Sequence, residues 1–168
     1  MDSTTPLKVD RTIKLAQLVG AVEDARDAKK SALFIDETGQ VQVFFCYKAC
    51  LFELSRLRLA KTIGKKSAEE VNEEFRKIII NTMRSGAHLA ISVEKDIPDF
   101  KTEFADKTCV PPQLFDQKGI DNKEVFEPLL RDGDDHDRLG NKNCFHIQEG
   151  WMVSVGTIAP FETAAAAA

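Results

Sequence analysis

Short apolar runs that end at turn residues alternate along this chain with longer stretches of helical spacing. The first run, Ala32–Ile35, stops abruptly at Asp-Glu-Thr-Gly in positions 36–39. Such a short run between turn residues is typical of a strand buried on both faces, as in a parallel sheet. Similar runs follow at 88–93 and 151–158. Strands separated by helices predict βαβ units with right-handed crossovers.

Three further stretches are assigned from their spacing. Residues from Asp10 to Lys29 contain no proline and repeat apolar residues at helical intervals, so we expect an amphipathic helix with Asp10 as its N-cap. Residues 40–54 lack glycine and proline, and their length favours a helix, although the alternation at their start would also suit a strand. Residues 56–60 alternate polar and apolar, which predicts a strand nearer the sheet edge.

The clearest predicted helix begins after Ser67, which forms a capping-box pattern with Glu70, and ends at Gly86. From residue 95 to residue 150 the signals are weaker, because prolines, glycines and an acidic turn interrupt the pattern. Short helices are expected there at 99–104 and 123–130.

Together these elements predict one α/β fold with a mostly parallel sheet and flanking helices. The 168 residues suffice for one domain with its own core. We expect an N-terminal helix over 1–30, an α/β domain over 31–161 with a long irregular insertion at 95–150, and a tail over 162–168. The five alanines that end the chain are excluded from functional reasoning.

Composition argues against several classes of partner. The formal net charge of −4 gives no general attraction to nucleic acid or to anionic lipid. No run approaches the roughly 18 apolar residues of a membrane span, and the N-terminus lacks a signal-peptide pattern. The cysteines show no CxxC pair or zinc spacing, which favours a reducing, cytosolic location; they are Cys46, Cys50, Cys109 and Cys144.

Several short motifs follow one another along the chain in an order that can be compared with known families. They are the strand-turn Leu33-Phe34-Ile35-Asp36 followed by Gly39-Gln40, the strand 57–59, the helix end Arg84-Ser85-Gly86 leading into 89–94, the segment Phe126-Glu127-Pro128-Leu129-Leu130, and an apolar strand with Gly156-Thr157. This order resembles the fifth AAA+ module of dynein heavy chains and the related C-terminal domain of some IQ-motif and ankyrin-repeat proteins. The resemblance covers about residues 31–161. It implies a degenerate P-loop NTPase (AAA+)-like fold with a structural rather than a hydrolytic role.

The segment 33–37 has the form of a Walker B strand, in which Asp36 would hold the Mg²⁺ shell and Glu37 would polarise water. That chemistry needs a P-loop, and no G-x-x-x-x-G-K-[ST] sequence is present. The nearest approach is Gly64-Lys65-Lys66-Ser67, which lacks a preceding glycine. We therefore interpret Asp36 and Glu37 as turn residues and 65–67 as a basic turn with a capping serine. A magnesium or phosphate site remains the alternative.

Other polar clusters do not form a recognisable site. The acidic turn at 132–137 fails the EF-hand pattern, because its sixth and twelfth positions are Asp137 and Asn143 instead of glycine and glutamate. The histidines at 88, 136 and 146 have no nucleophile or ligand partner at a diagnostic spacing. We accordingly expect no catalytic, cofactor-binding or metal-binding residues.

The expected function is that of a non-catalytic interaction module. By analogy with the resembling proteins, it would be a microtubule-associated component of a ciliary or flagellar axoneme, with tubulin or axonemal proteins as partners. The alternative is a small nucleotide-binding protein or phosphotransferase that uses Asp36, Glu37 and the Lys65–Ser67 turn. A third possibility is a fragment whose P-loop lies in another polypeptide.

The insertion at 95–150 also carries several apolar residues: Phe100, Phe104, Val110, Leu114 and Phe115. They suggest either that the insertion docks onto a partner or that it covers one face of the sheet.

Overall fold

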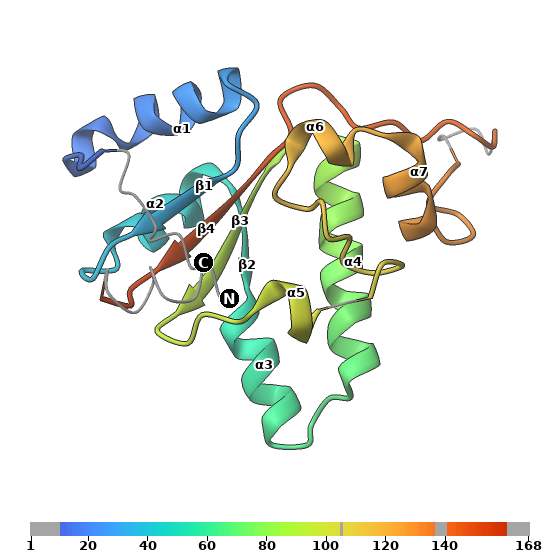
Figure 1. Ribbon diagram of the computed structural model, residues 1–168, viewed down its shortest axis with the longest axis horizontal. Helices are drawn as coiled ribbons and strands as arrows, with labels where there is room; N and C mark the ends of the chain where they lie inside the picture. Colours follow the sequence, from blue (N-terminus) through green and yellow to red (C-terminus); the bar gives the residue numbers. More distant parts are fainter. Residues whose placement is uncertain (1–10, 105, 137–140, 161–168) are drawn as a thin grey trace, which may run out of the picture.

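The computed structural model describes residues 11–104, 106–136 and 141–160. Among these residues, four strands form one sheet (Figure 1). Their order across the sheet is β1 (Ala32–Ile35), β4 (Met152–Thr157), β3 (His88–Glu94) and β2 (Cys50–Glu53). Every neighbouring pair is parallel. The predicted α/β class with a parallel sheet and flanking helices is therefore confirmed.

The chain crosses the sheet once and then returns strand by strand. From β1 it passes through α2 (Gln40–Lys48) to β2 at the opposite edge. It returns through α3 (Leu54–Thr62) and α4 (Ala68–Ser85) to β3. The connection from β3 to β4 contains the short elements α5 (Phe100–Glu103), α6 (Gln117–Ile120), α7 (Lys123–Phe126) and η2 (Glu127–Leu129).

The predicted N-terminal helix is present over part of its length. It consists of the 3₁₀ turn η1 (Leu15–Gln17) followed by α1 (Leu18–Asp27). The proposed N-cap Asp10 and the tail 162–168 lie outside the described residues. None of the described helices combines the length and the apolar character needed to cross a bilayer.

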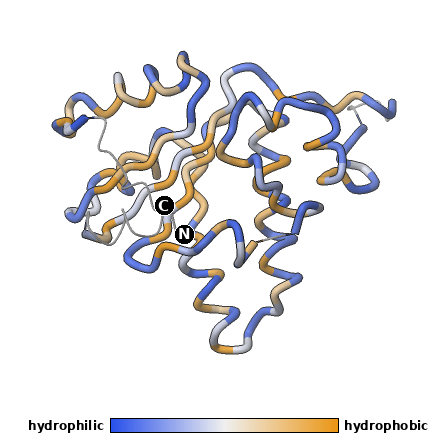
Figure 2. The backbone as a smooth tube through the Cα atoms, viewed as in Figure 1, coloured by the Kyte–Doolittle hydropathy of each residue, from blue (hydrophilic) through white to orange (hydrophobic). Residues whose placement is uncertain are grey.

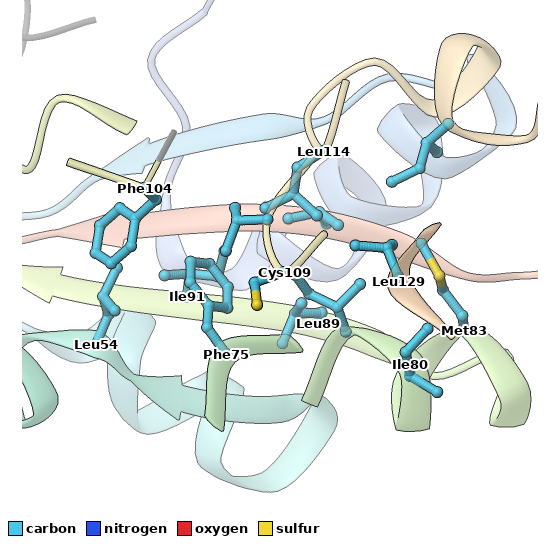
Figure 3. Close-up of a cluster of buried hydrophobic side chains, with 14 of the residues drawn as sticks. Leu54, Phe75, Ile80, Met83, Leu89, Ile91, Phe104, Cys109, Leu114 and Leu129 are labelled. Atoms are coloured by element: carbon cyan, nitrogen blue, oxygen red, sulfur yellow. The ribbon is translucent and has the colours of Figure 1, made fainter. Parts of the chain in front are cut away.

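Alternate residues of the central strands point into two different cores. Leu89, Ile91 and Val93 of β3 belong to a large cluster with α4 and the segments that follow β3 (Figure 3). Ala90 and Met152 face the other side, where they pack against α1 and α2. This two-residue period is a consequence of the pleat. The sheet is thus covered on both faces, and the strands are apolar along most of their length (Figure 2).

The helix α4 begins and ends as its sequence predicts. Ser67 accepts a hydrogen bond from the N–H of Glu70, and the Glu70 carboxylate accepts one from the N–H of Ser67. At the other end Gly86 takes a left-handed conformation with φ of 67°. A Cβ at this position would lie 2.6 Å from the carbonyl oxygen of Glu149, so both the backbone angle and the close approach require glycine.

The predicted strand at 56–60 is wrong, because these residues lie in α3. As a strand, Leu57 and Leu59 would share one face. In the structure Leu57 packs against the large core, whereas Leu59 is 61% exposed. The fully buried Leu54 lies three residues before Leu57, so the buried residues of this segment follow the helical period. Arginine, leucine and alanine are also good helix formers.

The edge strand on this side is formed instead by residues that the sequence assigned to a helix. The predicted helix at 40–54 ends at Lys48, and Ala49 is already extended with φ of −140° and ψ of 170°. Cys50–Glu53 then pair with β3, with Leu51 opposite Ala90. An apolar stretch without glycine or proline gives no local signal for this change, so tertiary pairing decides it.

The insertion at 95–150 covers one face of the sheet. Phe104, Val110 and Leu114 are buried in the large core, and Phe100 and Phe115 pack against it. The two short helices expected in this region are found as α5 and as α7 with η2. Its apolar residues therefore supply the core that lies between α4 and the strands.

A buried arginine fastens the end of this insertion to α4. Arg76 is 3% exposed and donates two hydrogen bonds to Glu73, at 2.8 and 2.7 Å. Its other terminal nitrogen donates to the carbonyl oxygen of Leu129 at 2.7 Å and to the carboxylate of Asp134 at 2.6 Å. The acidic partners raise the pKa of Arg76 further above its ordinary value. One side chain therefore ties α4 to the segment between η2 and β4.

We expect Arg76→Ala to lower the free energy of unfolding by about 3 kcal/mol, because it removes the buried donor to Glu73 and to the Leu129 carbonyl and the ion pair with Asp134. Urea denaturation measures the change. The control is Arg56→Ala, which removes an exposed ion pair with Glu53 and should cost less than about 1 kcal/mol. Equal losses in the two variants would contradict the role assigned to Arg76.

Candidate functional site

The carboxyl end of β1 carries the residues that the sequence placed in a possible nucleotide site. Asp36 follows β1 directly, and α2 begins four residues later. The Asp36 carboxylate accepts hydrogen bonds from the N–H of Thr38 at 3.0 Å, the hydroxyl of Thr38 at 2.5 Å and the N–H of Val41 at 2.8 Å. Gly39 permits the turn between them with φ of 76°. Asp36 therefore caps the N-terminus of α2 from within its own loop.

The carboxylate of Asp36 occupies the position that a bound anion takes at a helix N-terminus. Free N–H groups and the helix dipole attract phosphate to such a position. Here the carboxylate of Asp36 bonds to these groups instead. Partial burial acts to raise the pKa of Asp36, but hydrogen bonds from Thr38, Val41 and Gln40 outweigh it and lower the pKa below its ordinary value. The cap is therefore ionised near neutral pH.

A groove of about 920 Å³ lies beside this turn. Its walls are the segment 11–15, α1, β1 and the turn that leads into α2. Asp36, Glu37 and Thr38 are among the residues that line it. Several of its lining residues are apolar: Ile13, Leu15, Leu18, Ala25, Leu33, Phe34 and Val41.

The structure does not bring the Lys65–Ser67 turn to this groove. That turn connects α3 to α4 and none of its residues lines the groove (Figure 1). Lys66 forms an ion pair with Glu74, and Ser67 is engaged in the capping box. The residues of the alternative nucleotide site therefore lie in two separate places. In the first place, at the start of α2, the carboxylate of Asp36 takes the position that a phosphate would need.

The acidic turn binds the protein's own backbone and arginines. Asp134 pairs with Arg76, and its backbone carbonyl accepts a hydrogen bond from Arg84. Asp135 accepts hydrogen bonds from the N–H groups of Asn143 and Phe145, at 2.8 and 3.0 Å. Asp137 lies outside the described residues. Within the described part of the chain, no group of three or more His, Cys, Asp or Glu residues is placed to hold a metal ion.

His88 is a packed core residue. Its Nε2 lies 2.7 Å from the hydroxyl oxygen of Ser154, and its ring meets that of Phe45 edge-on at 5.2 Å. Burial lowers the pKa of His88 to about 4, and the positive charge of Arg26 acts in the same direction. The imidazole is therefore neutral at pH 7 and serves packing, while the exposed His146 bonds to Gln148. All four cysteines carry free thiols.

Sequence reasoning missed the exposed apolar pairs on three N-terminal helical segments. They are Leu15 and Val19, Val43 and Tyr47, and Leu59 and Ile63, each pair separated by four residues. A signal for one of them was available. The sequence of α2 has no polar face, although a helix that covers one side of a sheet needs one.

Comparison with known proteins adds no assignment. No match was found among protein-family models, among curated proteins or among solved structures. The resemblance to an AAA+ module thus stays a prediction.

We expect Asp36→Ala to lower the free energy of unfolding by about 1–2 kcal/mol, because the first turn of α2 loses its cap. Thermal or urea unfolding measures the loss. The neighbouring Glu37 is exposed, so Glu37→Ala should change stability by no more than about 0.5 kcal/mol. A neutral Asp36→Ala variant would show that the carboxylate does not cap the helix.

We expect the free energy of unfolding to rise with pH between about 4 and 6.5, because the folded protein holds His88 neutral. The folded imidazole has a pKa of about 4 and the unfolded one a pKa near 6.5. The unfolded chain therefore binds the extra proton throughout this window, and stability is lost as the pH falls through it. The expected contribution is about 3 kcal/mol.

Urea unfolding at a series of pH values checks this dependence. His88→Asn should flatten the slope of stability against pH relative to the unmodified protein, whereas His146→Asn, which removes an exposed histidine, should leave it unchanged. If His88→Asn keeps the full slope, another group titrates and the assignment to His88 is wrong.

Proposed function

We propose that this chain is a non-catalytic interaction module that docks onto other proteins in a large cytoskeletal assembly. The observation that carries the proposal is the pattern of exposed large apolar side chains. Those found among the described residues form three pairs at a spacing of four residues, on η1 with α1, on α2 and on α3 with the residue after it. Paired apolar residues on outer helix faces are typical of protein-binding surfaces, whereas single scattered ones are not.

The face of α2 is the most exposed of the three. Tyr47 is 83% exposed and Val43 is 59% exposed, and Cys46 is also on the surface. Tyrosine supplies a large, amphipathic contact area and is enriched at protein interfaces. The resemblance to a dynein AAA+ module suggests which assembly is involved, namely the microtubule-based axoneme of a cilium or flagellum.

The chemistry of the β1–α2 turn also supports a binding role over nucleotide chemistry. Asp36 places a negative charge where a phosphate would have to bind, and repulsion between the two would oppose binding. Lys65 and Ser67, which the alternative function requires, belong to a different turn. We therefore retain the non-catalytic function as the conclusion.

Co-sedimentation with demembranated axonemes tests the proposal. We expect the full chain to pellet with axonemes in a saturable manner, and Tyr47→Asp to weaken this binding at least about tenfold by placing a charge in the apolar face. Lys48→Asp is the matched control, since it adds negative charge at the next exposed position of α2 and leaves the apolar pair intact; it should change binding no more than about threefold.

Two outcomes would overturn the proposal. One is that the full chain never pellets with axonemes above its background sedimentation. The other is micromolar binding of Mg-ATP by titration calorimetry that is lost in Lys65→Ala, because this result would favour the nucleotide-binding alternative.

A further inference from the structure

The outer side of β1 is an open sheet edge. Its only strand partner among the described residues is β4, with Ile35 opposite Thr157. The N–H of Asp36 donates to the carbonyl oxygen of Thr157 at 2.9 Å, which fixes the direction of every backbone group in the strand. In a parallel ladder, alternate residues direct both their N–H and their C=O to the same neighbour. The N–H and C=O groups of Leu33 and Ile35 therefore point away from β4.

These four groups have no partner in the described part of the chain. No hydrogen bond to the backbone of Leu33 or Ile35 comes from the loops, turns or side chains that the structure describes around β1. They face the groove of about 920 Å³ that separates β1 from the segment 11–15 and α1. Because unpaired backbone groups on a strand present alternating donors and acceptors, the chemistry that fits them is another extended backbone.

Within its four residues, β1 carries none of the residue features that keep sheet edges from pairing. Natural edge strands carry a charge, a proline or a bulge. The residues of β1 are Ala, Leu, Phe and Ile, and the irregularity in the sheet lies between β3 and β4 instead. At the opposite edge, β2 ends with the charged residue Glu53. The β1 edge is therefore the one that is suited to accept a strand.

The walls of the groove indicate the side chains that an added strand would carry. On the side of α1 and α2 the walls are apolar, through Ile13, Leu15 and Phe34. On the other side of the sheet the groove is lined by Leu33 and Ile35 of β1, which are apolar as well. Successive side chains of a strand point to opposite faces. The matching sequence therefore carries apolar residues at the alternate positions that face Ile13 and Phe34.

We propose that the edge of β1 binds an extended segment of a partner protein, with apolar residues at alternate positions, as a fifth strand of the sheet. This inference rests on the proposed function and names the surface and the kind of partner. Lys30 and Glu37 stand near opposite ends of the strand and can fix its direction by pairing with charges of the partner segment.

A phage-displayed library of random linear peptides tests the proposal on the full chain. Leu33→Pro is the informative variant. It removes an N–H that points outward and leaves the ladder to β4 intact, since proline is tolerated at such edge positions. Leu33→Val is its control, because it changes the side chain and keeps the N–H. We expect selected peptides to carry apolar residues at alternate positions and to bind Leu33→Pro at least about tenfold more weakly than either the unmodified chain or Leu33→Val.

Hydrogen exchange on the unmodified chain gives a second measurement that does not depend on the folding of a variant. A synthetic copy of a selected peptide should slow the exchange of the Leu33 and Ile35 amides at least about tenfold, because these two gain a partner. The proposal is overturned if no peptide is selected, if selected peptides bind Leu33→Pro as tightly, or if they protect α2 instead. It is also overturned if the chain forms dimers that Leu33→Pro dissociates, since the occupant would then be a second copy.

The axoneme assay separates this proposal from the proposed function. If the unmodified chain pellets with axonemes and folded Leu33→Pro pellets equally well, the module binds its assembly and the β1 edge is not the surface used. If the unmodified chain does not pellet while peptides still bind at β1, the assembly is wrong and the strand-accepting edge stands.

Discussion

The burial of the two central strands on both faces is the constraint on which the rest of the structure depends. Residues 88–93 of β3 and most of β4 are buried, so neither face of the sheet can meet water. Each face must therefore be covered by helices. On one side α4 and the segments after β3 supply the large core, and on the other side α1 and α2 supply a much smaller one. This imbalance explains why the insertion at 95–150 is packed while α2 keeps an exposed apolar face.

Local hydrogen bonds decide the chemistry at the carboxyl edge of the sheet. In an open α/β sheet this edge is where ligands bind. Here the carboxylate of Asp36 satisfies the amides at the start of α2, and Thr157 uses its hydroxyl to donate to the carbonyl oxygen of Glu94 at 2.6 Å. These polar groups of the edge are thus engaged with the protein's own atoms. Among the described residues, the backbone N–H and C=O groups of Leu33 and Ile35, at the side of the sheet, have no such partner.

The sequence predicted those features that short-range chemistry controls. The capping box at Ser67, the stop at Gly86 and the run of residues 32–35 each carry their signal within a few residues, and each was located correctly. The change from helix to strand at Ala49 has no such signal, because the apolar stretch around it suits both states. The change is decided by the pairing of 50–53 with β3. Because the sequence assigned 50–53 to a helix, the edge strand was wrongly placed at 56–60.

The candidate site was predictable only in part for the same reason. Asp36 and Glu37 were recognised as strand-end residues, but the groove beside them depends on the position of α1, which local sequence does not specify. The link from Arg76 to Asp134 joins residues that are distant in the chain, and it explains an acidic turn that sequence alone could only compare with calcium loops. Interactions across such distances are set by the fold and not by the spacing of residues.

The pairing of β1 with β4 has a consequence for how the chain acquires its fold. Ala32 lies opposite Ser154, which is far from it in the sequence, so β1 has no strand beside it until the β4 segment has been synthesised. The pair β2 and β3 can form earlier, since its members are close in sequence. Contacts between distant segments form slowly because of the entropy of closing a long loop. Until β4 has been synthesised, both edges of this apolar strand are open, and the nascent chain depends on α1 and α2 to shield it.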